Sequence, residues 1–259
     1  MMDFVVKIKD WWAVEAMIAS YNYAYHAAYK ITYEEVGPIG ITKYGNSHIA
    51  PYQFEFQALS PNSRAVVEAI RRYPIGDHDK YILNIFHASP TVPEQKAKYQ
   101  SLGYDFIRTG PILGRELPPS KQRNDVSNIH KVNTLHKAEH ANENLTNEGE
   151  RIPLDTLRDK QIHNFYADVS GRAVGWIQLI TVYPNVGYIQ HVYTMSMYRD
   201  LKIGSALVER AQIEAVSLGL QHMVTVPSEM ALGMAIRLGY RPLAYLTAFS
   251  PADDEINDE

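Results

Sequence analysis

The sequence contains no cysteine among its 259 residues. Disulfide bonds, thiolate nucleophiles and cysteine-ligated metal sites are therefore excluded. An excess of positive charge is also absent, because 25 Lys and Arg are outnumbered by 29 Asp and Glu and the formal net charge is −4. A protein of this charge is not expected to have nucleic acid as a partner.

Long apolar runs are absent as well, and none approaches the roughly 18 residues that a membrane-spanning helix needs. The first residues, "MMDFVVKIKDWW", lack the apolar core of a signal peptide. We therefore expect a cytoplasmic protein without a membrane partner. What the chain does contain is an ordinary globular balance of 46% hydrophobic and 21% charged residues, in a length sufficient for one large or two small domains.

The first half of the chain alternates expected helices and strands. Strands are expected at 54–59 and 81–86, with a helix between them over "SPNSRAVVEAIRRY". The polar stretch "GRELPPSKQRND" at 114–125 contains paired prolines and predicts a domain boundary. The acidic end, "SPADDEINDE", is expected to be disordered.

The second half has a clearer pattern. The segment "HNFYADVSGRAVGWIQLITVYP" predicts two strands around a glycine turn, and "VGYIQHVYTM" predicts a third. A helix is expected from Ile203 to Gly219, then the strand "LQHMVTV", a helix capped by Ser228 and ended by Gly239, and the strand "YRPLAYLTAF". This order is typical of an α/β protein with a mixed sheet.

The stretch "RDLKIGSALVERA" at 199–211 leads from the third of these strands into a helix. A helix start presents N–H groups without helical acceptors, and with the helix dipole they attract an anion. Gly204 and Ser205 are small enough to let a phosphate approach the backbone, and Arg199 adds a positive charge. A plain helix start with an exposed arginine is the alternative that this stretch alone leaves open.

Residues 125–250 resemble the GNAT superfamily of N-acetyltransferases. The family signature Arg/Gln-x-x-Gly-x-Gly/Ala is matched by "RDLKIG" at 199–204, while "ALVERAQIEAVSLGL" resembles the helix that follows it and "AIRLGYRPL" the late family motif. The resemblance implies a mixed α/β GNAT fold that binds acetyl-CoA as co-substrate and no metal. It also implies transfer of the acetyl group to a primary amine of a small molecule.

The resemblance also implies which residues bind acetyl-CoA. The pantetheine arm would pair with a strand edge at Val192, Tyr193 and Thr194. Ser228 falls where the family often has an asparagine that touches the cofactor. The residues implied for the pyrophosphate are Arg199, Asp200, Leu201, Lys202, Ile203, Gly204 and Ser205.

Two residues depart from the family pattern. Lys202 replaces the first glycine of the signature, and it costs about 1 kcal/mol if the backbone there has φ > 0. If φ is ordinary, its ammonium group is free to reach a phosphate. Ala235 stands where the family usually has the tyrosine that gives a proton to the leaving thiolate, which alanine cannot do.

The catalytic candidates are His191 as a base and Tyr188 or Tyr240 as a substitute acid. Counting in twos from Thr194 predicts that Val192, Gln190 and Tyr188 share one strand face and that His191 points to the other. A β-bulge would shift this register. Asp and Glu are absent from 186–199, so a carboxylate base must come from elsewhere or a water chain must serve.

The chain also contains an internal repeat. "KYQSLGYDF" resembles "MAIRLGYRP", and their glycines, Gly103 and Gly239, are 136 residues apart. The first copy keeps the motif tyrosine as Tyr99, but Glu68 stands where Gly204 would be, and a carboxylate repels pyrophosphate. We therefore predict a tandem organisation, with a degenerate GNAT-like domain at 1–120, an acetyltransferase domain at 121–250 and a disordered tail at 251–259.

Other interpretations remain open. If the alanine at position 235 means that catalysis is lost, the chain is a non-catalytic acyl-CoA-binding sensor or scaffold. Acetylation of a protein N-terminus or lysine is a third option. Either a monomer or a homodimer is compatible with the sequence. The string "HKAEH" at 136–140 fits an inverted zinc-peptidase motif without its second half, so no metal is expected. A helix predicted over residues 10–30 carries three tyrosines at four-residue spacing, which share one face and are predicted to pack in the core: Tyr21, Tyr25 and Tyr29.

Overall fold

The structure, a computed structural model, describes residues 8–252 except 46–48, 77–78, 92 and 118–125. Most of the acidic end predicted to be disordered, from residue 253 on, lies outside the described residues. The chain divides into two compact units. The first comprises Met1–Trp11, Ile31–Pro111 and Leu243–Glu259, and the second comprises Trp12–Lys30 and Ile112–Pro242. This division differs from 1–120 and 121–250, because each unit contains a segment from the other half.

The first unit is built on a sheet with the strand order β1-β2-β3-β4-β11. Neighbouring strands are antiparallel except β3 and β4, which are parallel. The elements are β1 Thr32–Val36, β2 Ile39–Lys43, β3 Phe54–Ala58, α2 Ser63–Arg72, β4 Tyr81–His87, α3 Pro93–Gln100, β5 Tyr104–Glu116, whose end lies in the second unit, and β11 Arg241–Pro251, whose first two residues lie in the second unit. The expected strands at 54–59 and 81–86 and the helix between them are confirmed.

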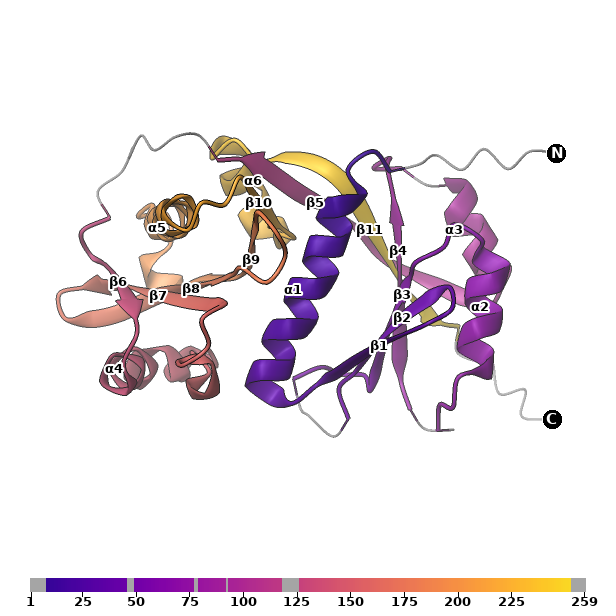
Figure 1. The fold of residues 1–259 in the computed structure, drawn as a ribbon, viewed down its shortest axis with the longest axis horizontal. Helices are drawn as coiled ribbons and strands as arrows, with labels where there is room; N and C mark the ends of the chain where they lie inside the picture. Colours follow the sequence, from indigo (N-terminus) through magenta and orange to yellow (C-terminus); the bar gives the residue numbers. More distant parts are fainter. Residues whose placement is uncertain (1–7, 46–48, 77–78, 92, 118–125, 253–259) are drawn as a thin grey trace. The chain divides into compact units, whose positions relative to one another are not determined.

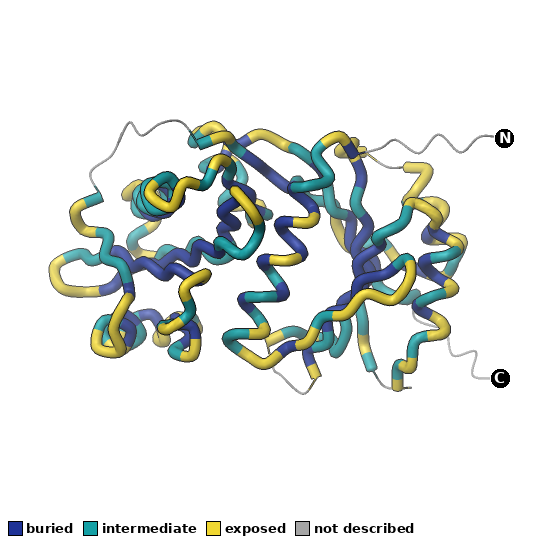
Figure 2. The backbone as a smooth tube through the Cα atoms, in the orientation of Figure 1, coloured by how far each residue is buried: buried dark blue, intermediate teal, exposed yellow. Residues whose placement is uncertain are grey.

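Helix α2 forms because its start is capped and its apolar residues lie on one face. The Asn62 side chain accepts a hydrogen bond from the Ala65 amide at 3.2 Å. Val66, Val67 and Ile70 are buried and pack with strand residues such as Phe56. Figure 2 shows that β2, β3 and β4 are the most buried strands of this unit, whereas β1 is mostly exposed.

The second unit has the strand order β5-β10-β9-β8-β7-β6. Helices α5 and α6 pack with one face of this sheet, and α4 packs on the other face (Figure 1). The elements are α1 Trp11–Tyr29, β6 Ile129–Val132, α4 Leu135–Leu145, β7 Ile162–Val169, β8 Arg172–Ile180, β9 Val186–Thr194, α5 Ile203–Ser217, β10 His222–Thr225 and α6 Glu229–Arg237, with short 3-10 turns η1 Thr146–Glu148, η2 Leu154–Thr156 and η3 Ser196–Tyr198.

The two halves of the chain repeat one topology but exchange their last strands. Each has an antiparallel strand pair, a parallel pair joined by a helix, a second helix and a final strand. The final strand of the first repeat, β5, pairs with β10 in the second unit over Leu113–Glu116. The final strand of the second repeat, β11, pairs with β4 in the first unit over Tyr245–Phe249. The mixed α/β fold and the internal repeat are confirmed.

The predicted boundary at 114–125 needs a correction. Gly114, Arg115 and Glu116 belong to β5 and pair with β10, so the strand continues into the stretch that was interpreted as a linker. Polar composition misled the prediction because a strand at this place has only one face in the core. The rest of that stretch, 118–125, lies outside the described residues.

The tyrosine stripe of α1 is also not core. The rings form a ladder, with centroids 4.5 Å apart for Tyr21 and Tyr25 and 5.7 Å apart for Tyr25 and Tyr29, but the three side chains are half-buried or exposed. The buried face of the helix carries small and aliphatic residues such as Val14 and Ile18 instead. A four-residue spacing identifies a shared face but does not say which face of the helix is covered.

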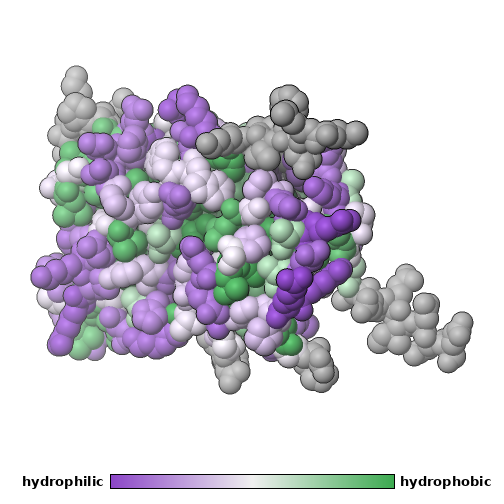
Figure 3. Space-filling view, turned by 45° about the vertical axis from the view of Figure 1, so that its right-hand side comes forward, coloured by the Kyte–Doolittle hydropathy of each residue, from purple (hydrophilic) through white to green (hydrophobic). Residues whose placement is uncertain are grey.

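The described residues contain neither a cluster that could hold a metal nor a helix that could span a membrane. No group of three or more His, Asp or Glu side chains in this part of the chain is arranged to hold a metal. His140 of the "HKAEH" string instead lies 3.6 Å from Asp168 and edge-on to Tyr166. None of the described helices is long and apolar enough to cross a membrane. On the face shown in Figure 3, hydrophobic residues form small patches that are bordered by hydrophilic residues.

Candidate functional site

The candidate site begins where β9 and β10 separate. The two strands run parallel and pair from Val186 to Ile189 on β9. β9 then continues to Thr194, past the end of β10, so one backbone edge of its last five residues is not paired with β10. The residues predicted to pair with a pantetheine arm, Val192 to Thr194, lie in this extension. An unpaired strand edge can accept an extended ligand as an added strand.

A β-bulge interrupts β9 at Gln190 and His191. Ile177 of β8 pairs with Val192, whereas Leu179, two residues later, pairs with Ile189. Two residues of β9 therefore oppose one residue of β8, and the side chains on the two sides of the bulge change face.

The prediction that Val192 and Tyr188 share a face is consequently wrong. Tyr188 pairs with Ile180 and Tyr193 pairs with Trp176, so these two tyrosines lie on one face, while Val192 lies on the other. Strict alternation fails here because the bulge adds one residue to the strand. The Oε1 atom of Gln190, in the bulge, is buried without a hydrogen-bond partner among the described residues.

The bulge brings His191 onto an aromatic side chain. Its imidazole stacks on the indole of Trp176, with ring centroids 5.0 Å apart and planes inclined by 24°. Burial lowers the pKa of His191 to about 4, so the ring is neutral at physiological pH. A neutral imidazole has a nitrogen free to accept a proton, although this pKa makes it a weak base.

Two carboxylates that the sequence analysis did not identify accompany this pair. Glu150 accepts a hydrogen bond at 3.1 Å from the Trp176 indole nitrogen. Glu148, at the end of η1, accepts hydrogen bonds from the Tyr193 hydroxyl and from the amide of Ser196 at 3.2 Å. The Tyr193 hydrogen bond and the Ser196 amide hold the pKa of Glu148 below its usual value, so Glu148 is ionised at neutral pH. The two glutamates of the "NEGE" segment after α4 were the feature of the sequence that could have indicated these carboxylates.

Tyr193 is positioned by this contact. Burial, together with the hydrogen bond to Glu148, raises the pKa of its phenol to about 12, so it stays protonated. Its hydroxyl donates to a carboxylate that lies 45 residues earlier in the chain. The carboxylate therefore ties η1 to the end of β9.

The loop after β9 resolves the two alternatives for Lys202. This residue has φ = 60°, in the left-handed region, and it precedes α5 without making a side-chain cap. Lysine is therefore strained at the place where the family has glycine. Asp200 is left-handed as well, with φ = 64°. The strained loop turns the chain sharply from β9 into α5.

The start of α5 has the geometry expected of an anion site. The first amide that donates within this helix is that of Ala206, to the carbonyl of Lys202 at 3.0 Å. The amides of Ile203, Gly204 and Ser205 precede it and have no carbonyl one turn earlier in the helix. Arg199 donates from Nε to the Thr194 carbonyl at 3.3 Å, which holds the arginine beside the loop.

Gly204 has a packing role that the sequence did not reveal. A Cβ atom at this position would lie 3.2 Å from the Met234 sulfur on α6 and 3.6 Å from the Thr194 hydroxyl on β9. The glycine therefore lets α5 start close to both neighbours. Ser228 caps α6 through its hydroxyl, which accepts from the Ala231 amide at 3.4 Å. Because α5 and α6 follow parallel strands, both begin at the same edge of the sheet.

The two tyrosines proposed as acids lie in the core. Tyr188 is 4% exposed and Tyr240 is 3% exposed. The Tyr240 hydroxyl accepts a hydrogen bond from Gln212 at 3.3 Å, and Gln212 lies nine residues into α5, roughly 13 Å along the helix from its start. Burial raises the pKa of Tyr240 to about 12. Ala235 is also buried, in the cluster that contains Tyr240.

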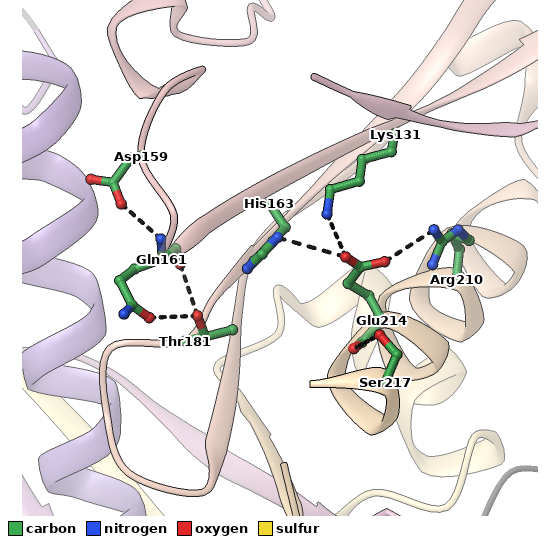
Figure 4. Close-up of polar contacts among 8 residues, drawn as sticks. All are labelled: Lys131, Asp159, Gln161, His163, Thr181, Arg210, Glu214 and Ser217. Carbon is green, nitrogen blue, oxygen red and sulfur yellow. Dashed lines mark hydrogen bonds and ion pairs between the residues drawn. The ribbon is translucent and has the colours of Figure 1, made fainter. Parts of the chain in front are cut away.

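A partly buried ionic cluster supports the sheet away from the loop (Figure 4). Glu214 of α5 accepts from Lys131 and, at 3.1 Å, from Arg210, and His163 of β7 lies 3.8 Å away. Burial opposes ionisation of Glu214, but the two cations outweigh it and lower its pKa. Burial likewise lowers the pKa of His163. The cluster connects β6 and β7 to α5.

This arrangement agrees with the comparisons with known proteins. Residues 129–240 match the model of the acetyltransferase (GNAT) family. A GCN5-related N-acetyltransferase from Kribbella flavida has 15% sequence identity and a TM-score of 0.67, with 91% of this chain and 95% of that chain covered. A tandem GNAT protein from the clavulanic acid biosynthesis pathway has 13% identity and a TM-score of 0.54, with 82% and 77% covered. No curated protein sequence matches. The chain therefore carries a domain of the GNAT acetyltransferase family within a fold that it shares with GNAT proteins along most of its length.

Proposed function

We propose that this protein is an N-acetyltransferase that uses acetyl-CoA and acetylates a primary amine of a small molecule. The observation that supports this most directly is the combination at the end of β9. An unpaired strand edge, a bulge with a stacked histidine and the open start of a helix lie within fifteen residues, from Gln190 to Gly204. The match of residues 129–240 to the GNAT family supports acyl transfer in general.

In this proposal the donor lies across the separation of β9 and β10. The pantetheine arm pairs with Val192, Tyr193 and Thr194, and the pyrophosphate binds the amides at the start of α5. Arg199 adds charge to the same loop. Ser228 is a contact at the start of α6. Phosphates bind well at such helix starts because the N–H groups and the dipole act together.

The acceptor amine approaches from the side of Glu148 and Glu150. An ionised Glu148 attracts an ammonium ion, which must lose a proton before it can attack. The ammonium first loses one proton to water. The neutral amine nitrogen then bonds to the thioester carbonyl carbon and gives its second proton to His191, directly or through water, while Trp176 orients the imidazole. The carbon–sulfur bond breaks, and the thiolate takes up a proton from water.

Water protonates the thiolate in this proposal. Ala235 has no proton to give, and the contacts of Tyr240 lie in the core, away from the loop. Losing a general acid costs about 10²–10⁴-fold in rate. We therefore expect slow turnover. Cytoplasmic location and a monomeric or homodimeric state remain predictions.

Calorimetric titration with acetyl-CoA tests the donor site. Gly204→Glu is expected to abolish binding, because it places a carboxylate at the pyrophosphate loop. Gly204→Ala is the matched control, since it adds only the Cβ atom that meets the flexible Met234 side chain. Loss of binding in Gly204→Glu but not in Gly204→Ala supports the proposal. Equal affinity in all three proteins would contradict it.

A non-catalytic acyl-CoA-binding protein is the second candidate. It is favoured by the buried Ala235 and by the low pKa of His191, since both weaken acid–base catalysis. Release of free CoA with a panel of small primary amines separates the two candidates. Tight acetyl-CoA binding without turnover of any amine would favour the sensor.

A further inference from the structure

A hollow lined by three arginines lies at the other end of α6. Its volume is about 400 Å³, and it is lined by Arg115 of β5, Glu116, Arg237 and Leu238 at the end of α6, Gly239, and Arg241 at the start of β11. Helix α6 is nine residues long, so its end is roughly 12 Å from the start that faces the acetyl-CoA loop. The hollow is therefore separate from the candidate site.

The guanidinium of Arg115 is held in place by the end of α6. It donates to the Leu238 carbonyl, to Gln212 at 3.4 Å and, from Nε, to the Glu116 carbonyl at 3.4 Å. These acceptors are all uncharged, so the positive charge of Arg115 is oriented but not neutralised. Its side chain is half-buried, whereas Arg237 and Arg241 are exposed.

The positive charges of the three arginines outnumber the negative charges around the hollow. Within the described part of the chain, no carboxylate lies within 4.0 Å of Arg115, Arg237 or Arg241 as an ion-pair partner. Glu116 lines the hollow and supplies one negative charge. The helix end contributes about half a negative charge, which favours a cation there but does not balance three. This excess is notable in a chain of net charge −4.

We propose that this hollow binds a small phosphorylated molecule at a second site, distinct from the acetyl-CoA loop. Guanidinium groups match phosphate oxygens in a two-pronged geometry, and three of them around one hollow suit a ligand with more than one phosphate charge. The volume is in the range of small-molecule sites, which begin at about 300 Å³. A nucleic acid surface is not favoured, because the formal net charge of the chain is −4.

Calorimetric titration with inorganic pyrophosphate tests this site. The titration uses the full chain carrying Gly204→Glu, so that the acetyl-CoA loop does not contribute. We expect binding in this background and at least tenfold weaker binding when Arg237→Gln and Arg241→Gln are added. Both arginines are exposed, so the fold should tolerate these substitutions. Arg158→Gln, which removes an exposed arginine outside the hollow, is the matched control and should leave the affinity unchanged.

The melting temperature provides a second measurement. Pyrophosphate should raise it in the Gly204→Glu background and in the Arg158→Gln control, but not in the double arginine variant. Three results would overturn the proposal: no binding in the Gly204→Glu background, unchanged affinity in the double variant, or an equal loss in Arg158→Gln. Acetyl-CoA binding by the double variant in the wild-type loop background should be retained, which separates this site from the proposed function.

Discussion

The imidazole of His191 lies on the indole of Trp176, with 5.0 Å between the ring centroids. This contact joins β9 to β8 at the β-bulge, and it directs His191 to the face on which Glu148 and Glu150 lie. It also covers part of the imidazole, and burial is the cause of its low pKa. The stacked pair is therefore the part of the proposed site whose chemistry is easiest to test.

We expect His191→Gln to lower kcat about 10²-fold, because the substitution keeps a polar side chain but removes the proton acceptor. Steady-state release of CoA with an accepted amine measures the effect. His136→Gln, at an exposed position of α4, is the control and should not change kcat. Full activity of His191→Gln would exclude the histidine as base.

The same histidine makes folding stability depend on pH. Its folded pKa of about 4 lies below the ordinary value of 6.5, so the unfolded chain binds more protons between these values. The contribution of the neutral histidine to the free energy of unfolding is therefore complete above about pH 6.5 and is lost as the pH falls toward 4. Urea denaturation at pH 7 and pH 4.5 should show a smaller difference for His191→Gln than for the wild type. Equal differences would mean that burial does not depress this pKa.

We expect Glu148→Gln to raise the KM of the amine about tenfold with a smaller effect on kcat, because the ionised carboxylate attracts the ammonium form of the acceptor. Steady-state kinetics over a range of amine concentrations provide the values. Glu143→Gln removes an equivalent exposed charge from α4 and should leave KM unchanged. A KM that is insensitive to Glu148→Gln would place the acceptor elsewhere.

Lys202→Gly should stabilise the protein by about 0.5–1 kcal/mol, since glycine tolerates φ = 60° and lysine does not. The greater freedom of glycine in the unfolded chain offsets part of this gain. Urea denaturation gives the free energy of unfolding. Lys160→Gly, in an exposed turn where φ is not positive, should destabilise instead. If both variants lose stability, the left-handed lysine is not strained.

Ala235→Tyr, which would restore the family tyrosine, is expected to destabilise the protein by about 1–3 kcal/mol, because Ala235 is 5% exposed and packed in the core. Thermal unfolding compares it with Ile236→Tyr, a substitution at a neighbouring position that is 46% exposed. Only the first should lower the melting temperature markedly. A stable and faster Ala235→Tyr enzyme would show instead that the space for the tyrosine persists.

Neither half of the chain should fold alone. A piece of residues 121–259 lacks Leu113–Glu116, which pairs with β10, and its β11 lacks β4. A piece of residues 1–120 lacks β11. We expect each piece to be insoluble when expressed separately, and the two to copurify when expressed together. A dispersed amide NMR spectrum from the isolated 121–259 piece would contradict this.

Local patterns in the sequence were sufficient for much of this description. Runs of apolar residues predicted β3, β4 and β8, and Ser228, predicted as a helix cap, lies where α6 begins. The motif around Gly204 identified the loop and its family. These features depend on residues that are neighbours in the chain, where spacing and conformational preference act directly.

Tertiary structure decided the rest, because the features concerned depend on residues that are distant in the chain. The bulge at His191 is set by pairing between β8 and β9, and Glu148 reaches Tyr193 across 45 residues. Nothing local to β5 or β11 indicates that each pairs outside its own repeat. A strand's residues specify an apolar face, but its partner is chosen by long-range hydrogen bonding and packing.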